Sequence, residues 1–216
     1  EEYLIKRMSY GGSIAYVTST GGLYWDKYSF EFDRFTAAKT WDEMINALHA
    51  QANENTLGMM AYPLSKRALN YYMSKLAIEL GPQKIRVNAL LPGSTDTGMK
   101  EEFEVEAGGI DALVAETGTA NRLATPEEMA KPLIFLNSEM ASFITGLPLI
   151  VDAGTNAMVK LKLKKDRMNM RVGLKLFNLS FVQNQLAKQL EPLNKEKKKT
   201  EQTTQKTDKT DTKKET

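Results

Sequence analysis

Residues 62–93 read YPLSKRALNYYMSKLAIELGPQKIRVNALLPG, and this stretch decides the fold. Its first part repeats apolar side chains at the spacing of one helix face, namely Leu69, Tyr72, Met73, Leu76 and Leu80. Gly81-Pro82 then supplies a stop signal, and Ile85–Leu91 is a largely apolar segment, interrupted by Arg86 and Asn88, that indicates a buried strand. The stretch therefore predicts a helix over residues 62–80 that leads into a buried parallel strand.

Two further strands are predicted around this unit. Ile14–Val17 and Leu147–Val151 are short, apolar and rich in strand-forming residues. Ahead of the last strand, Thr125-Pro126-Glu127-Glu128 forms a capping box with proline at the first helical position, which predicts a helix that runs to about Asn137. The alternation of continuous apolar strands with helices indicates an α/β fold with a parallel sheet.

The segment 23–60 stands apart because of its aromatic side chains. Thr40 and Glu43 form a second capping box, and they predict a helix whose apolar face carries Trp41, Met44, Ile45 and Leu48. The aromatic residues of the segment are Tyr24, Trp25, Tyr28, Phe30, Phe32, Phe35 and Trp41. Two interpretations are open: a lid over a bulky apolar substrate, or a set of side chains that only pack the segment onto the domain or a partner.

The composition excludes several kinds of site. The chain has 216 residues, no cysteine and one histidine, His49. Disulfides, thiolate catalysis and cysteine metal sites are therefore excluded, and a His-based triad or a multi-histidine metal site is not expected. Proton chemistry must use Tyr, Lys, Asp or Glu. No apolar run approaches the ~20 residues that a membrane helix needs, so we expect no membrane span and a cytoplasmic protein.

Charge divides the chain into an acidic body and a basic tail. Residues 1–155 hold 13 Lys and Arg against 20 Asp and Glu, whereas residues 156–216 hold 16 against 7. We interpret the basic extension over 156–194 as solvated, with contact to an anionic surface such as lipid or nucleic acid as the alternative. Residues 195–216 contain no apolar side chain and cannot offset the entropy of ordering, so we predict a disordered polar tail.

Tyr62 and Lys66 are the first candidates for chemistry. They stand four positions apart on the predicted helix, so their side chains share one face one turn apart. A nearby ammonium favours a phenolate and lowers the pKa of a phenol, which lets a tyrosine exchange a proton with an alcohol or carbonyl near neutral pH. Ser19, at the end of the first strand, could hydrogen-bond the same oxygen. The spacing alone is common on surface helices, so the surrounding sequence decides.

Four motifs follow one another along roughly residues 10–155. They are GGSIAYVTS (11–19), YPLSKRAL (62–69), IRVNALLPGSTDT (85–97) and SFITG (142–146) running to VDAG (151–154). Together they resemble the classical short-chain dehydrogenase/reductase family. The resemblance implies that the chain carries the C-terminal half of a Rossmann-type doubly wound parallel sheet, with an inserted aromatic-rich helical segment and a disordered C-terminal tail.

The resemblance also implies a role for each site residue. Ser19 matches the serine that holds the substrate oxygen, Tyr62 the general acid/base, and Lys66 the lysine that lowers the tyrosine pKa and binds the nicotinamide ribose. The loop that contacts the nicotinamide end is matched by Pro92, Gly93, Thr95 and Thr97. The implied cofactor is NAD or NADP, and the implied substrate is a small-molecule alcohol or ketone. Asp152 and Gly154 match positions that serve structure.

Two departures from the family pattern carry weight. About a dozen residues usually separate the serine from the tyrosine, whereas Ser19 and Tyr62 are 43 positions apart. The enlarged segment looks like that of the subgroup related to 3α-hydroxysteroid and coniferyl-alcohol dehydrogenases, which favours a hydroxysteroid, bile acid or aromatic alcohol. The glycine-rich phosphate loop, the residue that selects NAD or NADP and the family's catalytic asparagine are also missing, so the main cofactor-binding segment is absent from this chain.

These observations lead to one leading interpretation and one alternative. We expect a partial Rossmann domain over residues 1–155 with an insertion over 23–60, a basic extension over 156–194 and a tail over 195–216. The intact protein is expected to be an NAD(P)-dependent oxidoreductase that forms a homodimer or homotetramer and binds no nucleic acid, with this fragment inactive alone. The alternative is a non-catalytic remnant that serves as an interaction or oligomerisation module.

Overall fold

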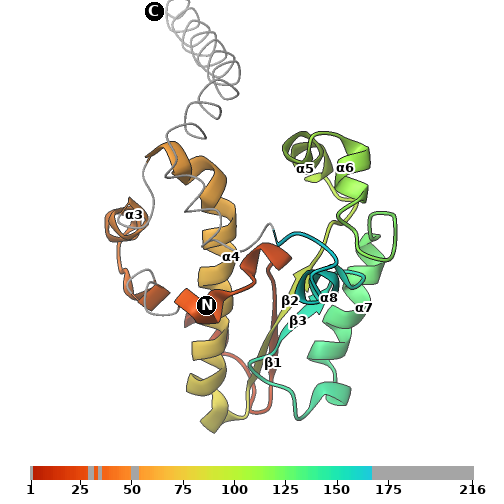
Figure 1. Ribbon diagram of the computed structural model, residues 1–216. Coiled ribbons are helices and arrows are strands. Elements are labelled where there is room, and N and C mark those ends of the chain that lie inside the picture. Colours follow the sequence, from red (N-terminus) through yellow and green to blue (C-terminus); the bar gives the residue numbers. More distant parts are fainter. Residues whose placement is uncertain (1, 29–31, 34–35, 50–53, 167–216) are drawn as a thin grey trace, which may run out of the picture. The chain divides into compact units, whose positions relative to one another are not determined.

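The computed structural model describes residues 2–28, 32–33, 36–49 and 54–166 (Figure 1). These residues fall in a compact unit that spans Glu1–Met168, whereas the second unit, Asn169–Thr216, lies outside the described residues. The predicted polar tail over 195–216 therefore cannot be compared with the structure. Residues 156–166, at the start of the basic extension, belong to the same compact unit as the sheet.

Three parallel strands form the centre of the described fold. They are β1 (Ser13–Val17), β2 (Arg86–Pro92) and β3 (Pro148–Val151), with β2 in the middle. Ile14 pairs with Val87, and Leu90 pairs with Leu149. All three strands lie within a residue or two of the predicted ranges, because a short, largely apolar segment between helices is typical of a strand in a parallel sheet. The predicted parallel α/β sheet is confirmed.

The helices lie against both faces of this sheet (Figure 1). The two that form the main layers are α4 (Glu54–Glu79) and α7 (Pro126–Asn137). Shorter helices complete the fold: α1 (Glu2–Ile5), α3 (Trp41–His49), α5 (Lys100–Ala107), α6 (Ile110–Val114) and α8 (Thr155–Lys160). Single 3-10 turns follow β1 as η1 (Thr20–Gly22) and η2 (Trp25–Tyr28), follow α4 as η3 (Gly81–Gln83), and follow α7 as η4 (Glu139–Ala141).

The apolar stripe read from the sequence builds the main core. Met73 and Leu76 of α4, and Leu80 directly after it, are buried in one cluster with side chains of β2, and Leu69 and Tyr72 of the same stripe are partly buried. The β2 members of that cluster are Val87, Ala89 and Leu91, which alternate along the strand and so share one face. Burial of this stripe against the sheet is what holds α4 in place.

Asn88 occupies the opposite face of β2, and its role is structural. Its side-chain amide donates to the carbonyl of Ile144 at 2.9 Å, and its carbonyl accepts from the backbone N–H of Leu147 at 3.0 Å. Both polar ends of a fully buried side chain are thereby satisfied. These two bonds hold the segment that leads into β3.

The helix that carries Tyr62 begins earlier than predicted. The sequence indicated a start at residue 62, but α4 begins at Glu54 and contains Pro63. A proline near a helix start is usual because its missing N–H is one of the unpaired donors there, but Pro63 lies inside α4. Within a helix, proline leaves the carbonyl four residues earlier without its donor. Residues 54–60 of the predicted insertion are therefore helical.

The two predicted capping boxes differ in the structure. At α7, Thr125 accepts from the N–H of Glu128 and the carboxylate of Glu128 accepts from the N–H of Thr125, as predicted. At α3, Thr40 accepts from the N–H of Glu43 at 3.2 Å, but the carboxylate of Glu43 bonds the N–H of Lys39 instead.

The predicted apolar face of α3 is also only partly covered. Trp41, at the start of that face, is 70% exposed. Met44 and Ile45 are partly buried. A helical spacing of apolar side chains thus identified the helix, but it did not determine which of them are covered.

Candidate functional site

The predicted site residues gather where the three strands end. Ser19 follows β1, the loop from Pro92 to Thr97 follows β2, and Asp152 follows β3. Because the strands are parallel, their carboxyl ends meet at one edge of the sheet, which is where parallel α/β folds bind ligands. The same end of the sheet faces α5 and α6 in Figure 1.

Tyr62 and Lys66 lie one turn apart on α4, as their spacing predicted. The Lys66 ammonium nitrogen is 5.3 Å from the centre of the Tyr62 ring. Both side chains are partly buried. The arrangement places a cation beside a phenol at the edge of the sheet where the strand ends converge.

Ser19 and Tyr62 both lie beside Gly21. A Cβ atom on Gly21 would be 3.4 Å from Cε1 of Tyr62 and 3.5 Å from Oγ of Ser19. Oγ of Ser19 accepts a hydrogen bond from the N–H of Gly21 at 3.0 Å. The structure thus brings the predicted serine and tyrosine together, 43 positions apart in sequence, on either side of a residue without a side chain.

The loop that carries Ser19 is fixed on α4 by two buried side chains. The amide of Asn70 donates to the carbonyl of Gly22 at 3.0 Å, and Nε of Arg67 donates to the carbonyl of Leu23 at 2.8 Å. Arg67 is only 1% exposed although it adjoins Lys66 in sequence. A Cβ atom on Gly22 would lie 2.9 Å from the backbone oxygen of Lys66, so this close approach requires glycine.

Phe103 of α5 is a site residue that the sequence analysis missed. Its ring meets the ring of Tyr62 edge-on, with 5.6 Å between centres and 76° between planes. An edge-to-face contact of this kind is a favoured aromatic geometry. Phe103 is the one aromatic residue in the otherwise acidic stretch KEEFEVEA, and that isolation was the signal that could have identified it.

The loop after β2 is held mainly through its backbone. The N–H of Gly93 donates to the carbonyl of Val151 at 2.9 Å, and the hydroxyl of Thr95 donates to the carbonyl of Gly93 at 3.0 Å. The hydroxyl of Thr97 accepts from the N–H of Met99 at 3.4 Å, a long bond that leaves this group weakly held. Pro92, Gly93, Thr95 and Thr97 therefore form a second group, built on β2 and β3.

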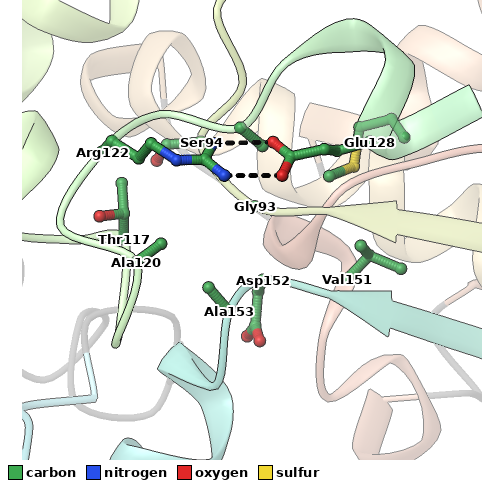
Figure 2. A pocket seen from close by; sticks show the side chains of 11 residues that line it. Gly93, Ser94, Thr117, Ala120, Arg122, Glu128, Val151, Asp152 and Ala153 are labelled. Carbon is green, nitrogen blue, oxygen red and sulfur yellow. Dashed lines mark hydrogen bonds and ion pairs between the residues drawn. The ribbon is translucent and has the colours of Figure 1, made fainter.

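A cavity of about 180 Å³ lies beside this second group (Figure 2). It is lined by Gly93 and Ser94 after β2, by Val151–Ala153 after β3, and by residues near the start of α7. Ser19, Tyr62 and Lys66 do not line it. The cavity is thus separate from the predicted catalytic group and adjoins the predicted cofactor loop.

Charged side chains border this cavity. Figure 2 shows Arg122 paired with Glu128 through two bonds, of 2.8 and 2.7 Å. The bond from Arg122 and the N–H of Thr125 lower the pKa of Glu128 to about 2. Asp152 is occupied by the backbone, because its two oxygens accept from the N–H groups of Gly154 and Asn156. The structural role expected for Asp152 agrees with these bonds.

The aromatic side chains of the insertion divide into separate groups. Trp25 and Phe32 both lie against Tyr71 of α4, with ring centres 6.4 and 6.2 Å apart, and Phe32 is buried. Tyr71 donates to the carboxylate of Asp33, and this bond raises the pKa of Tyr71 to about 12. Trp25 and Phe32 thus pack the insertion onto α4. Phe30 and Phe35 lie outside the described residues.

Tyr24 does not take part in the contacts around Tyr71. Its hydrogen-bond partner, Asp166, is the last residue of the described chain. Its hydroxyl donates to the carboxylate of Asp166 at 2.7 Å. Burial, followed by the bond to Asp166, raises the pKa of Tyr24 to about 12.

A search of the helices in the described ranges identifies none that is long and apolar enough to cross a membrane. Nor do those ranges contain a cluster of three or more His, Cys, Asp or Glu side chains suited to a metal ion.

Known proteins can now be compared with this geometry. The family profile described as "Enoyl-(Acyl carrier protein) reductase" matches residues 34–156. The chain is 42% identical over 96 residues to the 3alpha-hydroxysteroid dehydrogenase of Mediterraneibacter gnavus, which covers 44% of this chain and 37% of that protein. It is 37% identical over 93 residues to the L-rhamnose 1-dehydrogenase (NAD(P)(+)) of Azotobacter vinelandii, which covers 43% and 36% respectively.

A solved structure of a short chain dehydrogenase family protein from Francisella tularensis is 26% identical, with a TM-score of 0.49, and the match covers 72% of this chain and 55% of that one. The chain spans less than half the length of the two curated relatives. The profile covers more than half of this chain, and it includes both Tyr62 and Lys66 and the loop after β2. On this evidence the chain belongs to the short-chain dehydrogenase/reductase family.

Proposed function

We propose that the protein containing this chain is an NAD(P)-dependent oxidoreductase that interconverts an alcohol and a carbonyl on a bulky apolar substrate. The observation that carries the proposal is the cluster at the end of β1, where the Ser19 hydroxyl and the Tyr62 ring lie against Gly21 with the Lys66 ammonium over the ring. A phenol, a hydroxyl and a cation near one another are the groups needed to transfer a proton to or from an alcohol oxygen.

Each of the three residues has a separate part in the proposed reaction. Tyr62 takes the proton from the substrate hydroxyl during oxidation and returns it during reduction of the carbonyl. Ser19 donates to the same substrate oxygen and sets its position. Lys66 stabilises the negative charge that develops on the phenolic oxygen. When bound, a nicotinamide dinucleotide supplies or accepts the hydride.

The residues present fit the nicotinamide end of such a cofactor. Lys66 and Tyr62 would hold the ribose, and the loop of Pro92, Gly93, Thr95 and Thr97 would hold the carboxamide end. A Cβ atom on Gly93 would be 3.0 Å from Cα of Asp152, so the loop passes close to the residue that follows β3. The A. vinelandii relative, whose name includes NAD(P)(+), supports this choice of cofactor.

The proposal of a bulky substrate rests on two points. One relative is named as a 3alpha-hydroxysteroid dehydrogenase. The second is the edge-on contact between Phe103 and Tyr62, which places an apolar wall beside the proposed acid/base. The aromatic insertion adds less support than its composition suggested, because Trp25 and Phe32 pack against Tyr71. A hydroxysteroid, a bile acid or an aromatic alcohol remains the proposed substrate class.

The predicted boundaries at residues 155 and 194, and the assembly into a homodimer or homotetramer, remain proposals. We also propose that the protein is cytoplasmic. We also propose that the main dinucleotide-binding segment is not part of these 216 residues, so that the chain alone binds NAD(P) poorly.

The test is an oxidation assay with the longest in-frame product that contains these residues. Steroid, bile-acid and aromatic alcohols are each offered with NAD⁺ and with NADP⁺, and reduced cofactor is followed by absorbance. Oxidation of at least one of these classes is expected. A product that binds dinucleotide but oxidises none of them, while it associates with itself or another protein, would favour the non-catalytic module.

A further inference from the structure

The last part of the described chain, residues 161–166, leaves α8 and reaches other elements with its side chains. The helix ends at Lys160, and Lys162 adopts a left-handed backbone with φ of 60°. The N–H of Leu163 then bonds the carbonyl of Met158 at 2.9 Å, which turns the chain away from the helix axis. Lys164 and Asp166 follow directly after this turn.

Lys164 makes the first of two long-range contacts. Its ammonium donates to the backbone carbonyl of Ala115 at 2.8 Å. Ala115 is the residue at which α6 ends, and α6 directly follows α5, the helix that carries Phe103. Residues 161–166 are thereby joined to the end of α6, next to the helix that carries Phe103.

Asp166 makes the second contact, with Tyr24 in the segment that follows η1. Its carboxylate accepts from the hydroxyl of Tyr24 at 2.7 Å, across 142 positions of sequence. Tyr24 comes five residues after Ser19 and directly after Leu23, whose carbonyl is held by Arg67. With its pKa raised to about 12, Tyr24 keeps its proton and remains a donor. The segment is thereby joined to the loop that positions Ser19.

These two contacts tie together the parts of the chain that flank Tyr62. Phe103 lies against the Tyr62 ring from α5, and Gly21 lies against it from the Ser19 loop. A segment of a few residues, bonded at Ala115 and at Tyr24, limits how far these two flanks can separate. Figure 1 shows α8, from which the segment leaves, at the same end of the sheet as α5 and α6.

We propose that residues 161–166 are a strap across the substrate side of the site, and that the hydrogen bond between Tyr24 and Asp166 is a specificity determinant that restricts substrate size. The proposal rests on the oxidoreductase function proposed above. Release of the bond lets the Ser19 loop and α6 separate, so a large alcohol gains access relative to a small one.

Hydrogen–deuterium exchange on the 216-residue chain tests the strap without any assay of activity. Tyr24→Phe removes only the hydroxyl, whereas Asp166 has further interactions, so the tyrosine variant is the cleaner probe. Exchange in residues 19–24 and 161–166 should rise together, by about fivefold for the loss of one hydrogen bond. Exchange in β2 should not change.

Two further variants complete this experiment. Lys164→Met keeps the side-chain length and removes the ammonium, and it should raise exchange in residues 110–116 and 161–166. Tyr10→Phe is the matched control, because Tyr10 is exposed and lies away from the strap contacts. Unchanged exchange in residues 19–24 of Tyr24→Phe would overturn the strap.

Substrate selectivity tests the consequence for the site. In the longest in-frame product, kcat/KM is measured for deoxycholate and for cyclohexanol. Tyr24→Phe should raise the ratio of the two, deoxycholate over cyclohexanol, by about fivefold through a lower KM for deoxycholate. An unchanged ratio in an active enzyme defeats the specificity role alone. A parent that oxidises neither of these two compounds nor any of the steroid and aromatic alcohols defeats the proposed function together with the specificity role, and the exchange data then still report whether the strap exists.

Discussion

Two loops leave neighbouring strands at the same edge of the sheet, but they are held in different ways. Buried side chains of α4, Asn70 and Arg67, hold the loop after β1 by its carbonyl groups. Backbone bonds hold the loop after β2, with Gly93 bonded to Val151 of β3. The first loop carries the proposed substrate-orienting serine, and the second carries the proposed cofactor contacts.

The difference shows where each part of the site is specified. The position of Ser19 depends on the identity of side chains on α4, the helix that also carries Tyr62 and Lys66. The position of the loop after β2 depends on the pairing of β2 with β3. This pairing uses backbone groups, which almost every residue type provides. Substitutions on α4 should therefore disturb the catalytic group more than substitutions of similar size disturb the cofactor loop.

The largest effect is expected from the phenol itself. Tyr62→Phe in the longest in-frame product should lower kcat by about 10²–10⁴, the usual contribution of a general acid or base, while dinucleotide binding persists. Lys66→Ala should lower kcat and weaken dinucleotide binding together. Steady-state kinetics and a cofactor titration by fluorescence separate the two outcomes. Turnover at the parent rate by Tyr62→Phe would remove Tyr62 from the mechanism.

The next effect compares glycines of the two loops. Gly22→Ala places a Cβ atom against Nδ2 of the buried Asn70 and 2.9 Å from the backbone oxygen of Lys66, whereas Gly93→Ala places one 3.0 Å from Cα of Asp152. We expect Gly22→Ala to reduce the free energy of unfolding by about 1–3 kcal/mol and Gly93→Ala to reduce it less. Urea denaturation of the 216-residue chain measures both.

The control for this pair is Gly81→Ala, since a Cβ atom there meets nothing within 4 Å. A larger loss of stability for Gly93→Ala than for Gly22→Ala would contradict the distinction between the two loops.

A smaller effect is expected when the side chain that holds the Ser19 loop, Asn70, is compared with a hydroxyl of the loop after β2, Thr95. Asn70→Ala deletes the bond to Gly22 inside the protein, where Asn70 is fully buried, and it should cost about 1–3 kcal/mol and lower kcat. Thr95→Val deletes a partly buried bond within its own loop and should cost about 1 kcal/mol, and its effect on activity should appear in the KM for the dinucleotide and not in kcat. Equal losses of kcat in the two variants would show that the anchors are equivalent.

The smallest effect is expected from the ion pair between Arg122 and Glu128, and it depends on pH. Arg122 holds the pKa of Glu128 at about 2, below its usual value of 4.5. A carboxyl group with a lowered pKa in the folded state stabilises the fold above the unfolded pKa and loses this contribution as pH falls toward the folded value. The difference in melting temperature between the parent and Glu128→Gln should therefore be greatest above about pH 4.5 and disappear toward pH 2.

Glu106→Gln is the matched control for this measurement, because Glu106 is an exposed carboxylate of α5. A difference for Glu128→Gln that stays constant from pH 7 to pH 2 would show that the pair with Arg122 does not contribute in this way.

Part of the fold could be predicted because its signals are local. The stripe from Leu69 to Leu80 and the apolar run from Ile85 to Leu91 each report burial through their own spacing, and both predictions are confirmed. The start of α4 was predicted too late, at Tyr62, because the apolar stripe that identified the helix begins only at Leu69 and does not mark where the helix begins. The helices α5 and α6 were not predicted, because the acidic stretch from Lys100 to Ala107 has no apolar stripe strong enough to identify them.

The candidate site divides in the same way. The sequence by itself determined that Tyr62 and Lys66 share a helix face, since a separation of four residues and the geometry of a helix suffice for that. It also determined that Ser19 and Gly93 follow strands, since each stands at the end of an apolar run. These conclusions concern residues close to one another in the chain or directly beside an element.

Only the tertiary structure decided which distant groups meet. It brought Ser19 to Tyr62 across Gly21, placed Phe103 on the Tyr62 ring, and joined Tyr24 to Asp166. Such contacts depend on how helices and strands pack, and many sequences with the same local periodicity could pack differently. The physical reason is that periodicity reports which face of an element is buried, whereas packing alone selects the partner that covers it.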